Sequence, residues 1–253
     1  MAAAMFKMGR KSSLLLSLAY LVFVNVPHAT SLISFDYNFS IPGVLTSADI
    51  EYVSNATASS DRIDLTVDKL WSTGRAAYGQ PADGMAFFLG PYPVTLPQDS
   101  NGGFLGLVNN PNNTANTDFP PAVAVEFDTF HNHWDPNDTV NHFGVDINRI
   151  ISSAYTPLPD GCFNGTMSAL VRYEANSRQL SATLRFDDDL DLPGLPRLYY
   201  VTATVDFKDA GLPQNAAVGF SGATGDFIES HQILSWSFES TLTSVAVVNK
   251  TGK

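Results

Sequence analysis

Apolar and polar residues alternate along most of the chain after about residue 30. A period of two places successive side chains on opposite faces of a strand. Gly, Pro, Asn and Asp turns separate the alternating stretches, and the sequence shows no sustained helical spacing. The alternation is clear from Phe35, Ile63, Ala169, Leu180, Tyr199 and Leu234 onward. This pattern predicts an all-β protein, built as an antiparallel β-sandwich.

The first 30 residues follow a different pattern. Lys7, Arg10 and Lys11 precede the apolar run LLLSLAYLVFV, and small residues follow near Ala29. A basic start, a short apolar run and small residues are typical of a secretory signal peptide. The run is shorter than the roughly 20 residues that span a bilayer. We therefore expect residues 1–30 to be a signal peptide and 31–253 to be one domain without a transmembrane segment, secreted to the extracellular space or the vacuole.

Charge and cysteine content narrow the possible partners and the sources of stability. The formal charge is −11, and loss of the three basic residues of the leader would make it −14. Such an acidic chain is a poor candidate for binding nucleic acid. Cys162 is the single cysteine, so no intrachain disulfide can form, and we interpret it as a small apolar filler. N-x-S/T sequons, which predict a glycoprotein, begin at Asn38, Asn55, Asn112, Asn137, Asn164 and Asn249.

Residues 122–146, AVAVEFDTFHNHWDPNDTVNHFGVD, concentrate the side chains that bind metal ions. The alternation of a strand puts Glu126 and Asp128 on one face, opposite the apolar residues. Asn132, Asp135 and His142 follow in a loop and at its end. Carboxylate and amide oxygens suit calcium, whereas carboxylates with one imidazole suit a first-row transition ion. Surface carboxylates on a half-buried strand would be the simpler interpretation, but three more ligand types in one short loop favour a metal site.

The motif VAVEFDTF…N…WDP…H…G(V/I)D resembles the metal-binding signature of the legume (L-type) lectins. The resemblance covers nearly all of the chain after the leader and implies a jelly-roll of two large sheets. It also implies a manganese-type ion held by Glu126, Asp128, Asp135 and His142. A calcium ion would be held by Asp128, the Phe130 carbonyl, Asn132 and Asp135. Ser152 matches a serine that touches a metal-bound water.

Three further stretches match the same family: PADGMAFFL, NGGFLGL and SGATGDFIESHQILSWSF. They imply a calcium- and manganese-dependent carbohydrate-binding protein for mono- or oligosaccharides and glycoproteins. A carboxylate can accept hydrogen bonds from sugar hydroxyls, and amides can donate them. A shallow site binds one sugar weakly, so we expect a homodimer or a higher homo-oligomer. The implied carbohydrate-binding residues are Asp83, Gly103, Phe130, Asn132 and Asp226.

The sequence departs from the family at one junction and leaves other functions to be weighed. Gln80 runs straight into Pro81, where the family has a segment of about two strands, so the sandwich would lack two strands. One alternative is therefore a storage or defence protein, or a fragment of a receptor ectodomain, that has lost sugar binding. A glycosidase would need a second glutamate in the pattern E-x-D-x-x-E, where this chain has His131. We expect a protein that is not an enzyme.

Overall fold

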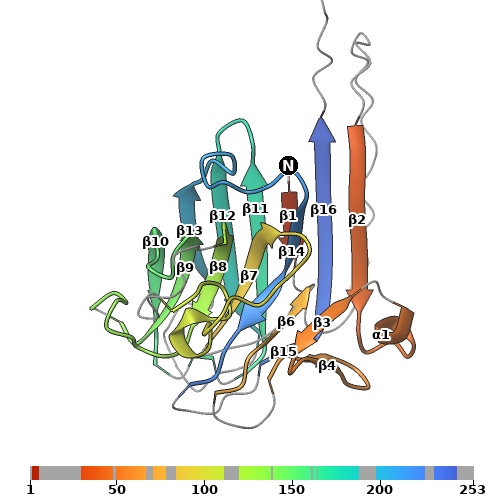
Figure 1. The fold of residues 1–253 in the computed structure, drawn as a ribbon, viewed down its shortest axis with the longest axis horizontal. Coiled ribbons are helices and arrows are strands. Elements are labelled where there is room, and N and C mark those ends of the chain that lie inside the picture. Colours follow the sequence, from red (N-terminus) through yellow and green to blue (C-terminus); the bar gives the residue numbers. More distant parts are fainter. Residues whose placement is uncertain are drawn as a thin grey trace, which may run out of the picture.

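Two large antiparallel sheets, one of six strands and one of seven, form the body of the molecule (Figure 1). The predicted all-β sandwich is confirmed. A small three-stranded sheet and two very short helices complete the described fold. The computed structural model describes residues 2–5, 30–47, 50–66, 71–77, 84–110, 120–137, 139–160, 162–163, 165–187, 198–225 and 231–243.

The two longest strands that the structure describes, of nine residues each, lie in the six-stranded sheet. Neighbouring strands pair antiparallel throughout. In spatial order its strands are β13 (Leu198–Thr204), β12 (Gln179–Phe186), β11 (Met167–Glu174), β1 (Ala2–Met5), β16 (Ser235–Thr243) and β2 (Thr30–Asn38).

The seven-stranded sheet carries the residues that the sequence singled out for metal binding. Its order is β10 (Ala154–Leu158), β9 (Asn141–Ile147), β8 (Val123–Asp128), β7 (Gly84–Pro91), β14 (Ala216–Gly222), β6 (Gly74–Ala77) and β3 (Glu51–Ser54). The small sheet and the helices are β15 (Gln232–Ile233), β5 (Ile63–Asp64), β4 (Thr57–Ala58), α1 (Val44–Ser47) and η1 (Gly102–Phe104).

The main core contains alternate residues from both large sheets. Val125 of β8 and Phe143 of β9 belong to the same buried cluster as Leu184 and Trp236 of the six-stranded sheet. A second, smaller cluster includes Ala124 and packs loop residues against the opposite face of the seven-stranded sheet; its members are Ala86, Phe88, Val94, Phe104, Leu105, Leu107, Val108, Ala124 and Ile150. Both faces of β8 are therefore buried, and the side chains that alternate with its core residues lie beneath loops rather than in solvent.

The strand β1 comes from the start of the predicted leader. Ala2 pairs with Tyr173 of β11 on one side and with Ser240 of β16 on the other. The four residues of β1 thus separate two strands of eight and nine residues. The leader's apolar run and the Gln80–Pro81 junction lie outside the described residues. Among the described helices, none has the length and hydropathy of a membrane span.

Candidate metal centre

The alternation of β8 and β9 brings two carboxylates and one imidazole to the same face. Asp128 pairs with His142 across the two strands, and Glu126 pairs with Gly144. The Glu126 and Asp128 side chains are 0% and 1% exposed. Burial of two carboxylates beside each other is unfavourable unless positive charge accompanies them. The sequence pattern placed these residues on one face, and the covering loops make that face a closed, charged site.

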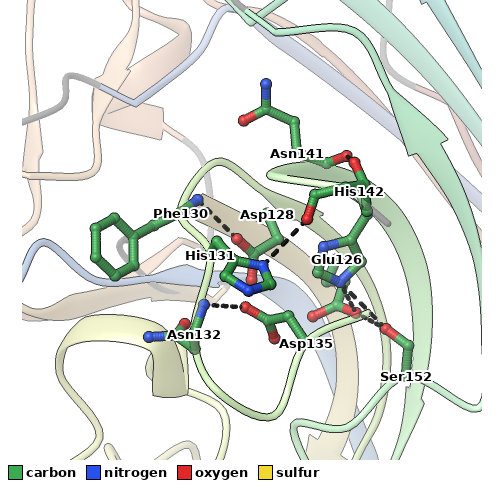
Figure 2. A network of polar contacts seen from close by, with 10 residues as sticks. Glu126, Asp128, Phe130, His131, Asn132, Asp135, Asn141, His142 and Ser152 are labelled. Carbon is green, nitrogen blue, oxygen red and sulfur yellow. Dashed lines mark hydrogen bonds and ion pairs between the residues drawn. The ribbon is translucent and has the colours of Figure 1, made fainter. Parts of the chain in front are cut away.

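Glu126, Asp128 and His142 form a compact group of potential metal ligands. One donor atom from each side chain lies within 4.8 Å of the donor atoms of the other two. His142 Nε2 is 3.1 Å from Glu126 Oε1, and Ser152 Oγ donates a hydrogen bond to the same carboxylate oxygen (Figure 2). The set of hard oxygens with one imidazole is chemically suited to a divalent cation.

The loop after β8 returns its polar groups to this cluster. The Phe130 N–H donates a 2.8 Å hydrogen bond to Asp128 Oδ1, and the Asn132 N–H donates to Asp135 Oδ2. Figure 2 shows Asp135 close to Asp128, with its carboxylate turned toward the Asn132 N–H. Asp135 is not one of the three residues of the compact group. Asn132 Oδ1 is buried and has no hydrogen-bond partner among the described residues. A buried amide oxygen in this state is costly, and a cation would satisfy it.

A second loop touches Asn132 from the other side. A Cβ atom built at Gly103 would lie 2.7 Å from Asn132 Nδ2 and nearer still to its Oδ1, so any side chain at residue 103 would displace the Asn132 amide. The ring of Phe104 stacks on Trp134 with centroids 5.0 Å apart, which packs the two loops together. The Gly102 N–H donates to the Thr224 carbonyl at 3.3 Å. Segments around residues 103, 132 and 224 thus converge on one place.

Two predicted sugar-binding residues, Asp83 and Asp226, lie outside the described residues, and their roles stay predictions. The described residue next to Asp83 lies beside the metal-ligand group. Gly84, which follows Asp83, pairs with Asp128 across β7 and β8. Gly84 has a φ of +119°, and a Cβ there would lie 2.5 Å from the Phe127 carbonyl oxygen, so the close approach requires glycine.

Asp146 is a further buried carboxylate beside Glu126 and Asp128, and the sequence analysis assigned it no role. His142, Gly144 and Asp146 alternate along β9 and so share a face, and Asp146 is 3% exposed. Burial, followed by the neighbouring Glu126 and Asp128 carboxylates, raises the pKa of Asp146 well above its ordinary value. The signal in the sequence was the alternation within HFGVD, which puts Asp146 in step with His142.

Metal binding is expected to weaken as the pH falls below 6. Burial raises the pKa of Asp135 to about 6, against the hydrogen bond from Asn132, which lowers it. Below that pH a cation must displace a proton, so its affinity should fall about tenfold per pH unit. The raised pKa also means that the metal-free fold loses stability as pH rises from about 4 to 6.

Calorimetric titration of calcium and manganese at pH 5 and pH 7 measures this dependence. The substitution Asp160→Asn removes an exposed carboxylate and should leave the pH dependence intact. Equal affinities at the two pH values would contradict a role for a protonated Asp135.

Comparison with known proteins shows which family the chain is similar to. The family model described as "Legume lectin domain" matches residues 79–252. The chain is 44% identical over 165 residues to a seed lectin of Vatairea macrocarpa, covering 64% of this chain and 61% of that protein. It is 37% identical over 185 residues to the L-type lectin-domain containing receptor kinase IX.1 of Arabidopsis thaliana, covering 72% of this chain and 27% of that protein.

The solved structures show the same fold. The crystal structure of basic winged bean lectin with Tn-antigen superposes with a TM-score of 0.67 and 28% identity, covering 85% of this chain and 100% of that chain. The chain spans little more than half the length of most curated relatives it matches, for example 56% of Lectin 6 from Medicago truncatula. The family assignment thus rests on sequence and on fold.

Proposed function

Since the chain belongs to the legume lectin domain family, we propose that it binds carbohydrates and catalyses no reaction. The observation that carries this proposal is the contact between Gly103 and Asn132 beside the buried Glu126–Asp128–His142 group. Two loops distant in sequence meet there, and each offers hydrogen-bonding groups at the edge of a charged centre. The Tn-antigen in the winged bean structure supports a sugar as the ligand class.

Different residues of the site would make the polar and the apolar contacts to the sugar. The Asn132 amide and the Gly103 N–H would donate hydrogen bonds to sugar oxygens. The Phe130 ring, which is half-buried, would cover the apolar C–H face of the pyranose. Asp83 and Asp226 would complete the site as hydrogen-bond acceptors. Such contacts discriminate hydroxyl orientations without any proton transfer.

We propose that the centre holds two cations, because its oxygens and one imidazole suit both calcium and a first-row transition ion. Glu126, Asp128, Asp135 and His142 would hold manganese, and Asp128, the Phe130 carbonyl, Asn132 and Asp135 would hold calcium, with Ser152 beside Glu126. When bound, the ions would supply the positive charge that the buried carboxylates lack. Asn132 would then be fixed in place, because its Oδ1, which has no hydrogen-bond partner among the described residues, would coordinate the calcium ion.

The expected partners are mono- or oligosaccharides and glycoproteins that reach the protein outside the cytoplasm. A leader at residues 1–30 would route the chain to the extracellular space or the vacuole. Assembly into a homodimer or a higher oligomer would raise the avidity of a weak single site.

A glycan array with and without chelator tests the proposal. We expect binding that EDTA abolishes and that calcium with manganese restores. Gly103→Ala should reduce binding at least tenfold, equivalent to about 1.4 kcal/mol, because its Cβ would displace Asn132. The control Gly90→Ala lies in β7, where the Cβ would meet only the Phe88 ring at 3.3 Å and, at 3.9 Å, the Pro121 carbonyl, and should bind as the unmodified protein does.

The second candidate is a lectin-like storage or defence protein, or a receptor-ectodomain fragment, without sugar binding. The similarity to part of a receptor kinase, whose remaining length this chain does not cover, favours it. Folded, metal-loaded protein that binds no sugar on the array would replace the first proposal with this one.

A further inference from the structure

The loop that carries the candidate centre also carries a glycosylation sequon. Asn137, Asp138 and Thr139 spell N-D-T between Asp135 and His142. The Asn137 side chain is exposed, whereas Asp135, two residues earlier, is only 7% exposed. The chain therefore passes from the buried centre to solvent within two residues, and the sequon asparagine stands on the outer side.

The sequon contacts the segment from Phe130 to Asn132, whose two end residues are proposed to touch the sugar. The Thr139 N–H donates to the Pro136 carbonyl at 3.4 Å, which closes a turn around Asn137. The Thr139 carbonyl oxygen lies 3.1 Å from His131 Nδ1. His131 stands between Phe130 and Asn132 in the chain, and Figure 2 shows it beside both. A group attached to Asn137 would thus project from the rim of the site.

The other described sequons differ in position and in the use of the amide. Asn55 is half-buried, and its Nδ2 donates to the Thr73 carbonyl at 2.9 Å, so the nitrogen that would carry a glycan faces protein. Asn38 is exposed at the end of β2, on the six-stranded sheet, and its Oδ1 accepts both hydrogen bonds from Ser40. Asn38 is an accessible sequon away from the candidate site.

We propose that Asn137 carries an N-linked glycan that shields the rim of the sugar site. N-glycans are bulky and hydrated, so an exposed turn tolerates one at Asn137. Such a glycan would obstruct large glycoconjugates while leaving room for a single sugar. The shielding rests on the proposed lectin function, whereas the modification itself requires only passage through the secretory pathway.

The test uses the full chain expressed in a secretory plant-cell host, with Asn137→Gln and, as a matched control, Asn38→Gln. Glycopeptide mass spectrometry reports which asparagines are modified. Calorimetry with methyl-α-mannoside and methyl-α-galactoside measures single-sugar affinity. Surfaces coated with yeast mannan and with a galactose-terminated glycoprotein measure binding to large ligands.

We expect a glycan on Asn137 and an increase of at least fivefold in the binding of Asn137→Gln to the coated surfaces. Its affinity for the methyl glycosides should stay within twofold of the unmodified sequence. Asn38→Gln should change neither the surface binding nor this affinity. An unmodified Asn137, or equal surface binding by all three proteins, would overturn the proposal. An equal gain for small and large ligands would also overturn it, because the glycan would then occupy the pocket. If none of the proteins binds sugar, the proposed function and the shielding fail together, and the mass spectrum still decides the modification.

Discussion

Adding calcium and manganese to the metal-free protein, prepared with a chelator, is expected to raise its unfolding temperature by about 5–10 °C. Glu126, Asp128 and His142 are buried together, and Asp135 and Asp146 bring further carboxyl groups to the same cluster. A cation that binds the folded state at 100 times its Kd stabilises it by about 2.7 kcal/mol. For a chain of this size each kcal/mol shifts the midpoint by roughly 2–4 °C. Differential scanning calorimetry measures the change.

The substitution Glu126→Gln separates metal binding from general packing. The amide keeps nearly the same shape and can still contact His142 and Ser152, but it removes one of the crowded negative charges. We expect the metal-free variant to unfold at a higher temperature than the metal-free parent and to gain little from added metal. A full metal response in Glu126→Gln would show that the ions act elsewhere.

Removal of residues 1–30 is expected to lower the unfolding temperature by roughly 10 °C. The strand β1 pairs with β11 and β16 at the same four positions, so its loss separates two strands that no other described strand bridges. Each backbone hydrogen bond contributes about 0.5–1.5 kcal/mol, and several are lost at once. The two bared edges also invite association with other chains. Thermal unfolding and light scattering of 1–253 and 31–253 measure both effects.

A point substitution in the full chain isolates the contribution of β1. Ala4→Pro removes a backbone donor from a central strand and should reproduce much of the loss of stability, whereas Ala4→Ser keeps the donor and should not. Identical unfolding of 1–253 and 31–253 would exclude a stabilising role for β1.

Insertion of a two-strand legume lectin segment between Gln80 and Pro81 should raise the stability of 31–253. Equal stability with and without the insertion would contradict the predicted cost of the short Gln80–Pro81 junction.

The sequence by itself determined the fold class and the ligand chemistry. Alternation with a period of two is a local property, and so Glu126 and Asp128 could be assigned to one face of a strand before any contact was known. The residue types of the following loop, Asn132 and Asp135 with His142 at its end, fixed a preference for oxygen-loving cations. The same alternation predicted the antiparallel sandwich. The resemblance to the legume lectins narrowed it to two large sheets, and the structure contains both.

The tertiary structure alone decided which residues meet and what covers them. Pairing of β8 with β9 set His142 opposite Asp128 and drew in Asp146, because register depends on contacts between segments that local pattern does not encode. The approach of Gly103 to Asn132 likewise depends on loop packing. The local pattern marks Ala2–Met5 as part of a leader, and it did not predict that these residues pair with β11 and β16. Such pairing joins segments far apart in the sequence, which a local pattern does not encode. Local periodicity fixes faces, whereas long-range backbone pairing fixes neighbours.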